Sequence, residues 1–175
     1  MKKIVMAVAA IAACAAAQAQ TETPFYAELG YTGITYEEPA GKAHPGMLRA
    51  IFGWEASPYV AIEAMGALSV QEDTVRVGGT NVDFKVEHSW GLFVKPKMKL
   101  GDAAEIFGRL GFTEHRLKAS AGGSSITDTG NDVSYGLGLK YSFSKSMYGV
   151  VDYMRYYDKD SIKIDGFTLG LGYKF

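Results

Sequence analysis

Hydrophobic and polar residues alternate with a period of two along most of the chain from about residue 25 onward. Successive side chains of a β-strand point to opposite faces, so this pattern predicts strands that each have one apolar face and one small or charged face. The clearest segment places Tyr135, Leu137, Leu139, Tyr141 and Phe143 opposite Ser134, Gly136, Gly138, Lys140 and Ser142. Eight strands are predicted, over residues 25–36, 47–55, 59–70, 84–98, 105–117, 132–143, 147–156 and 162–175.

The predicted connections alternate between short and long. Residues 56–58, 100–104 and 144–146 form short turns, whereas residues 37–46, 71–83 and 118–131 form longer polar loops, and residues 157–161 are the shortest of this second set. Short turns at one end and long loops at the other are typical of a transmembrane barrel with periplasmic turns and extracellular loops. Residues 119–125, rich in Gly and Ser, are expected to be flexible and available for contacts with host, phage or lipopolysaccharide.

Two architectures fit eight alternating strands: a soluble barrel with an apolar interior, and a membrane barrel with the opposite polarity. The aromatic residues favour the membrane barrel because they fall into two bands, as expected at the two interfaces of a bilayer. The band near the short turns comprises Trp54, Tyr141, Phe143, Tyr173 and Phe175, and the band near the loops comprises Phe112, Tyr135, Tyr153 and Phe167. Glycines on the charged face also fit a narrow interior, where small residues accommodate large neighbours. The predicted fold is an all-β, eight-stranded antiparallel up-and-down transmembrane β-barrel.

Composition narrows the range of functions. The 175 residues are 47% hydrophobic and 21% charged, which fits one folded domain. The net charge is −1 and no Lys/Arg cluster is present, so nucleic acid is not an expected partner. The single cysteine excludes a disulfide framework or a cysteine-based zinc site.

The first 19 residues have the features of a secretory signal peptide. Lys2 and Lys3 precede an uncharged apolar run that is shorter than the roughly 20 residues of a spanning helix, and Ala17-Gln18-Ala19 is a small-x-small cleavage site. We therefore predict a signal peptide at 1–19 and a barrel domain at 20–175. An alternative is that Cys14 is lipidated, because residues 11–14 (Ile-Ala-Ala-Cys) resemble a lipobox.

The chain resembles the small eight-stranded outer-membrane β-barrel family of the OmpA/OmpX type, porin-like outer membrane proteins of Gram-negative bacteria. The most specific motif is the last strand, in which Phe167, Leu169, Leu171, Tyr173 and Phe175 alternate up to a terminal aromatic residue. This motif resembles the signal that the barrel-assembly machinery recognises. The resemblance implies an outer-membrane location, outer-membrane lipid and lipopolysaccharide as neighbours, the assembly machinery as a partner during biogenesis, and a possible surface ligand at the loops.

Charged residues on the small face are expected to point into the lumen. They comprise five acids (Glu28, Glu55, Glu63, Glu87 and Asp152) and five bases (Arg49, Lys95, Lys97, Arg109 and Lys140). Because the interior of an eight-stranded barrel is just wide enough for side chains and lone buried charges are costly, a salt-bridge network that closes the lumen is expected. Arg49, Arg109, Glu55 and Glu63 are the predicted centre of this network. The alternative is a small gated pore whose ion pairs exchange partners.

The sequence favours a non-enzymatic protein with a structural or surface-interaction role. Some barrels of this size modify lipid A with a His and a nearby Ser or acidic residue, which leaves an enzyme as a further alternative. No His shares a strand face with a Ser within one strand. His44 is expected in the first loop, His88 facing lipid near the start of its strand and His115 facing inward near the top of its strand, each as a rim or loop residue and not a catalytic one. Acidic pairs such as Glu72-Asp73 lack the spacing of a calcium loop, and no cofactor or metal is expected.

Overall fold

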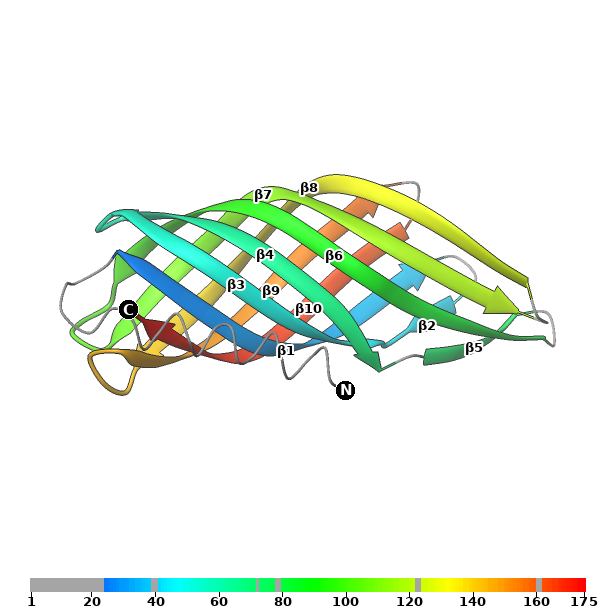
Figure 1. The fold of residues 1–175 in the computed structure, drawn as a ribbon, viewed down its shortest axis with the longest axis horizontal. Helices are drawn as coiled ribbons and strands as arrows, with labels where there is room; N and C mark the ends of the chain where they lie inside the picture. Colours follow the sequence, from blue (N-terminus) through cyan, green and yellow to red (C-terminus); the bar gives the residue numbers. More distant parts are fainter. Residues whose placement is uncertain (1–23, 39–40, 72, 78–79, 122–123, 160–161) are drawn as a thin grey trace.

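In the computed structural model, residues 24–38, 41–71, 73–77, 80–121, 124–159 and 162–175 are described, and these form a closed antiparallel β-barrel (Figure 1). Its strands are β1 (Phe25–Glu38), β2 (Gly41–Ala43), β3 (Gly46–Ser57), β4 (Val60–Gln71), β5 (Asp73–Val77), β6 (Thr80–Lys99), β7 (Ala104–Ala121), β8 (Ser124–Ser142), β9 (Met147–Lys159) and β10 (Ile162–Lys174). Each barrel strand pairs with its neighbours in the sequence, and β10 pairs with β1 from Tyr26↔Lys174 to Glu37↔Lys163. That last pairing closes the barrel, so that no edge of the sheet remains open at membrane depth.

The ten strands correspond to the eight predicted ones. β2 pairs with the outer end of β1, as β3 does with the rest of β1, so the two together make one interrupted barrel strand. β4 and β5 are related in the same way, since both pair with β6. The predicted fold class is therefore confirmed: an eight-stranded up-and-down antiparallel barrel.

All three of the predicted long loops are largely strand. Residues 37–46 contain the end of β1, all of β2 and the first residue of β3. Residues 118–131 continue β7 and β8 as a regular ladder up to Ala121↔Ser124, and much of 71–83 belongs to the β5–β6 hairpin. The composition of residues 119–125 suggested flexibility, yet their described backbone is paired. As a result β6, β7 and β8 contain 20, 18 and 19 residues, against 12 in β3 and β4.

The predicted short turns lie at the other end. β3 joins β4 through Pro58 and Tyr59, β6 joins β7 at residues 100–103, and β8 joins β9 at residues 143–146. Gly101 has a φ of 124°, a conformation that residues with a Cβ rarely adopt, which accounts for glycine in this tight turn. In Figure 1 these turns lie at the left, opposite the extended ends of β6, β7 and β8.

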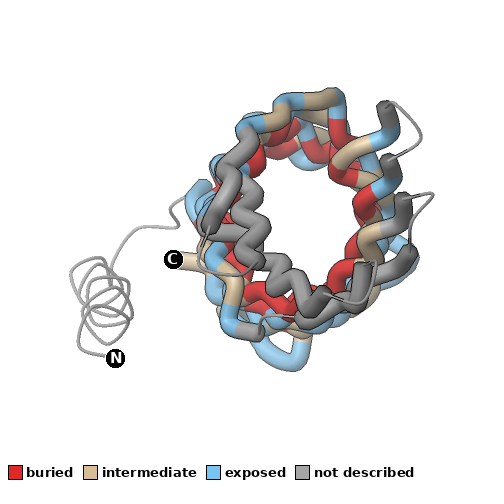
Figure 2. Tube along the Cα trace, turned by 90° about the vertical axis from the view of Figure 1, so that its right-hand side faces the viewer, coloured by how far each residue is buried: buried red, intermediate tan, exposed pale blue. Residues whose placement is uncertain are grey.

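The two faces of each strand have the polarity predicted for a membrane barrel. Outward apolar side chains are exposed, for example Leu137 at 69% and Leu169 at 64%, whereas inward charged residues such as Glu63 and Arg109 are 0% and 2% exposed. Viewed end-on, the buried positions line the inner wall of the ring (Figure 2). The aromatic residues of the two predicted bands are exposed on the outer wall, except Phe175, which is half-buried after the end of β10. Phe25 and Phe52 stack on each other at 5.6 Å in the band near the short turns.

Inward glycines accommodate the rings of large neighbours. Gly53 is paired with Tyr26, Gly172 with Tyr148 and Gly138 with Phe107, and a Cβ at any of these glycines would collide with the ring opposite. This explains why glycine alternates with charge on the lumen face, as the sequence indicated.

Residues 1–23 lie outside the described residues, so the signal peptide at 1–19 and the lipidation of Cys14 stay predictions. None of the described residues forms a helix long and apolar enough to cross a membrane.

Candidate functional site

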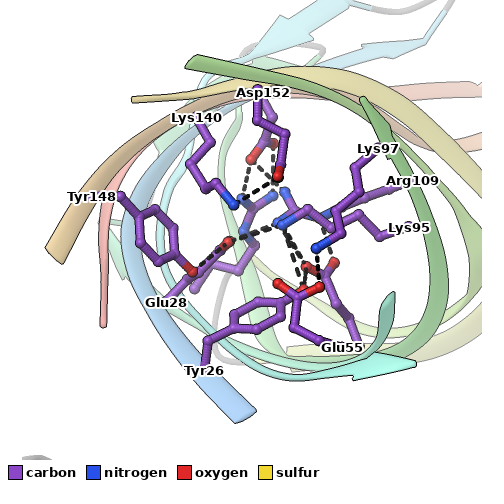
Figure 3. Close-up of polar contacts among 12 residues, drawn as sticks. Tyr26, Glu28, Glu55, Lys95, Lys97, Arg109, Lys140, Tyr148 and Asp152 are labelled. Atoms are coloured by element: carbon purple, nitrogen blue, oxygen red, sulfur yellow. Dashed lines mark hydrogen bonds and ion pairs between the residues drawn. The ribbon is translucent and has the colours of Figure 1, made fainter. Parts of the chain in front are cut away.

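Six of the predicted lumen charges meet in one buried cluster inside the barrel (Figure 3). We call Glu28, Arg49, Glu63, Lys95, Arg109 and Asp152 the central cluster. The Arg109 guanidinium donates to all three of its carboxylates, to Glu63 Oε2 at 2.5 Å, to Glu28 Oε2 at 2.6 Å and to Asp152 Oδ2 at 2.7 Å. Arg49 forms a two-pronged pair with Asp152, and Lys95 Nζ lies 3.2 Å from Glu28 Oε1 and 3.0 Å from Glu63 Oε1.

The central cluster crosses the lumen instead of lining it. Around the ring of eight barrel strands, β7 with Arg109 lies opposite β1 with Glu28. Tyr26 and Tyr148 donate hydrogen bonds to Glu63 and Glu28 at 2.6 and 3.1 Å, and Lys95 Nζ and the Arg109 guanidinium lie over the Phe107 ring at 4.3 and 4.6 Å. Three acids and three bases balance, and each buried charge has several partners, as a low-dielectric site requires.

Glu55 is not part of this cluster, contrary to the prediction that placed it at the centre. It pairs with Lys97 at the end of the lumen near the short turns. Glu105 pairs with Lys140 at the same end, at 2.7 Å. Sequence reasoning missed Glu105 as an inward acid, although its alternation with Phe107 and Arg109 on one strand face could have identified it. The side chain of Glu87 lies outside the described residues.

An apolar layer adjoins the central cluster, mostly on its loop side. It was not predicted, and its members are buried hydrophobic side chains that face inward: Ile34, Met47, Ile51, Met65, Ala67, Phe93, Met154, Tyr156 and Ile164. Tyr156 links the two layers, since its hydroxyl accepts a hydrogen bond from Arg49 at 3.0 Å. Because successive side chains alternate between the two faces of a strand, the sequence is sufficient to place these residues inside.

His115 faces inward, as the sequence suggested, but it is buried in the lumen and is not a rim residue. Its Nδ1 is hydrogen-bonded to the hydroxyl of Ser89 at 2.8 Å, across the β6–β7 ladder, and its Nε2 to the hydroxyl of Thr113 at 2.9 Å, two residues away on the same face. The Ser134 hydroxyl donates to the backbone carbonyl of Tyr156 at 2.9 Å. A partner on a neighbouring strand depends on register, which cannot be read from alternation. His44 and His88 are exposed.

We call Ser89, Thr113, His115 and Ser134 the hydroxyl cluster. It lies where the pairing between β8 and β9 ends. Regular β8–β9 pairing ends at Tyr135↔Arg155, and β9 has one extra residue, Tyr156, between the pairs Arg155↔Asp165 and Tyr157↔Ile164. Such a bulge leaves a backbone carbonyl without its ladder partner, and Ser134 supplies the missing donor. The cluster therefore has a structural explanation.

The last strand has the predicted alternation, with Phe167, Leu169, Leu171 and Tyr173 exposed on the outer wall. The N–H of Phe175 donates to the carbonyl of Phe25 at 3.1 Å, and the rings of Tyr173 and Phe175 are 5.6 Å apart. Among the described residues, no group of three or more His, Cys, Asp or Glu side chains is arranged to hold a metal ion.

A closed barrel with an apolar outer wall, two aromatic bands and buried internal ion pairs defines the class of integral outer-membrane β-barrels. The family model described as outer membrane protein beta-barrel domain matches residues 5–175, and the chain belongs to this family. It is accordingly a protein of the outer membrane of Gram-negative bacteria.

One curated relative is the attachment invasion locus protein of Yersinia enterocolitica, 28% identical over 101 residues that cover 57% of this chain and 53% of the relative. The match thus spans about half of that protein. Among solved structures, the attachment invasion locus protein Ail of Yersinia pestis, crystallised with the heparin analogue sucrose octasulfate, has a TM-score of 0.67 at 19% identity over 89% of this chain and 100% of the other. Neisserial surface protein A has a TM-score of 0.71 at 13% identity, over 87% of this chain and 98% of the other. At these identities the similarity shows the fold alone.

Proposed function

We propose that this protein is a non-enzymatic surface-interaction barrel, which presents an extracellular sheet to a partner while its lumen stays closed. The observation that carries the proposal is the length of β6, β7 and β8, which have 18 to 20 residues although 9–11 suffice to cross a bilayer. In Figure 1 these strands reach well beyond the ends of β9 and β10 at the loop side. We call their outer ends, with the β5–β6 hairpin, the projecting sheet.

The projecting sheet is suited to binding because its backbone is already paired in a continuous ladder. The β7–β8 ladder runs without a register shift from Ala104↔Tyr141 to Ala121↔Ser124, so its outer part continues the membrane-embedded part. About nine residues beyond the membrane-spanning part correspond to roughly 30 Å of extended strand. A partner that binds such a preformed surface loses less conformational entropy than one that must order a loop.

The relatives support a surface role. The curated relative is named for attachment and invasion, and the Ail structure from Yersinia pestis contains a heparin analogue. We propose by analogy that this chain binds a macromolecule outside the cell.

The test is to shorten the projecting sheet without touching the lumen. Residues 119–126 are replaced by Asn-Gly between Lys118 and Thr127, which are paired with each other, so that a two-residue turn closes the shorter hairpin. A non-adherent Gram-negative strain that displays the parent protein should adhere to epithelial cells, and the shortened variant at equal surface level should not. Binding of sucrose octasulfate to both purified proteins tests whether a sulfated sugar is the partner. Equal adherence of the two strains would contradict the proposal.

A second candidate, a small gated pore, is favoured by one feature. Arg109 contacts three carboxylates at once, so that its ion pairs could exchange without leaving a charge unpartnered. Against conduction, the apolar layer adds a second barrier in series with the central cluster.

The lipid A enzyme alternative would need the Ser89–His115 pair to be catalytic. Both ring nitrogens of His115 are occupied by hydroxyls, the side chain is 4% exposed, and within the described residues no carboxylate hydrogen-bonds its ring. A general base must reach a substrate proton, and this one is enclosed. We therefore assign the pair to the bulge in β9 and not to catalysis.

Export is part of the same proposal. Removal of residues 1–19 would leave a chain that starts at Gln20, close to the first described strand at Phe25. The intact mass of the protein from outer membranes would distinguish this form from one that starts at a lipidated Cys14.

A further inference from the structure

The end of the lumen near the short turns has an excess of positive charge. Lys97, Lys99, Lys140 and Lys174 occupy inward positions there with Glu55 and Glu105, which gives four positive charges against two negative. The central cluster, in contrast, balances at three against three. Among the inward side chains of this mouth, which faces the periplasm in a barrel with short periplasmic turns, lysines therefore outnumber acids by two.

Two of the four lysines at the mouth form no ion pair with a described acid. Lys97 pairs with Glu55 and Lys140 with Glu105, whereas neither Lys99 nor Lys174 forms an ion pair with any described acid. Lys97 also lies close enough to Lys99, Lys140 and Lys174 for their like charges to repel one another. The repulsion between neighbouring lysine ammonium groups raises the free energy of the charged mouth, and a bound anion would lower it.

An open cavity of about 390 Å³ lies at this mouth. Lys97, Lys99 and Lys174 line it with Glu55 and Glu105, and Phe25 and Pro58 form an apolar side. Phe25 belongs to the outer wall, where its ring stacks on Phe52 in the aromatic band. The cavity thus runs from the lumen mouth over the rim to the level of the lipid headgroups of the periplasmic leaflet.

We propose that this cavity binds a phosphate-type anion, held by Lys99 and Lys174 with Lys97 as a third donor. Lysine ammoniums are compact point charges with three donors each and serve widely as phosphate ligands. Glu55 and Glu105 also line the cavity, but each is paired with a lysine, so Lys99 and Lys174 remain as excess positive charge that one phosphate group would offset. This site is separate from the projecting sheet, which lies at the other end of the barrel.

The phosphate could belong to an anionic phospholipid of the periplasmic leaflet or be free in the periplasm. Two probes separate these sources: phosphatidylglycerol in nanodiscs, with retained lipid counted by native mass spectrometry, and inorganic phosphate, titrated against the protein in phosphatidylcholine nanodiscs. Retention of phosphatidylglycerol without phosphate binding identifies the lipid. Binding of phosphate alone identifies the free anion.

The test variant is Lys99→Gln/Lys174→Gln, which removes the two lysines without an ion pair and leaves Glu55 and Glu105 with their partners. We expect it to bind the effective probe about tenfold more weakly, as the loss of two partly exposed charge contacts implies. Lys145→Gln is the matched control, because Lys145 is exposed in the turn at the same end and does not line the cavity.

The proposal is overturned if the double variant retains both probes as strongly as the parent protein. It is equally overturned if Lys145→Gln weakens binding as much, since general attraction to a basic rim would then explain the result. Heat-modifiable mobility of each variant on gels confirms that the barrel is folded before binding is compared.

Discussion

Residues of similar type have different energetic roles in this barrel, depending on which side of the wall they occupy. Arg109 is enclosed and has three carboxylate partners, whereas Arg155 pairs with Asp158 and Asp165 near the outer rim, with 28% of its side chain exposed. Removing one member of a buried charge cluster leaves the others without compensation, while an exposed pair contributes little.

We predict that Arg109→Met destabilises the barrel by about 3–5 kcal/mol, because Glu28, Glu63 and Asp152 then share only Arg49 and Lys95. Arg109→Glu, which adds a fourth buried acid, should be worse. Arg155→Gln is the control and should cost less than about 1 kcal/mol. Urea unfolding in lipid vesicles measures all three. A loss at Arg109 as small as that at Arg155 would mean that water reaches the central cluster.

A second residue-scale prediction concerns the glycines of the lumen face. Gly53→Ala should destabilise by about 1–3 kcal/mol, because its methyl group would meet the Tyr26 ring in an interior without room to adjust. Gly66→Ala is the matched control on the outer face, where nothing lies within 4 Å of the added methyl group, and should be neutral or slightly stabilising. The same urea titration compares them. Equal effects would show that strand propensity, and not the ring, decides.

At the scale of the element, alternation predicted the strands and their faces where water or side chains lie on one side and lipid on the other. It failed for the outer ends of β7 and β8, because beyond the membrane neither face has lipid to select apolar residues. Alternation also could not predict how far along the barrel axis each inward residue lies. Glu55 and Glu63 share the lumen face, but the stagger of the strands brings Glu63 to Arg109 and Glu55 to Lys97.

The last strand provides a prediction at this scale. Deleting Phe175 removes one backbone hydrogen bond to Phe25 and the ring contact with Tyr173, a loss of about 2 kcal/mol from a finished barrel. We expect a larger defect in cells, where the terminal aromatic residue would be needed for recognition by the assembly machinery. The comparison is between the amount of heat-modifiable protein in outer membranes and the refolding yield in detergent. Matching, mild losses in both would indicate that Phe175 only packs.

At the scale of the whole molecule, the lumen is layered from the periplasmic mouth outward. Along β7, Glu105 of a mouth ion pair comes first, then Arg109 of the central cluster, then Thr113 and His115 of the hydroxyl cluster. The apolar layer adjoins both the central cluster and the hydroxyl cluster, since its Tyr156 binds Arg49 and contacts the His115 ring. An ion would have to pass the buried charge pairs and also the buried apolar side chains. If either the central cluster or the apolar layer is disrupted, the other still blocks the lumen.

This layering predicts the electrical behaviour of the protein. The unmodified barrel should give only rare, small openings in planar bilayers, and Arg109→Met should lower stability without a large increase in conductance, because Phe93 and Met154 still fill the apolar layer. Combining Arg109→Met with Phe93→Ala and Met154→Ala should produce frequent openings. Phe93→Ala/Met154→Ala alone is the control and should stay closed at the central cluster. Large, ion-selective openings of the unmodified protein would instead favour the pore function. Frequent openings of the Arg109→Met variant alone would show that the central ion pairs, and not the apolar layer, keep the lumen closed.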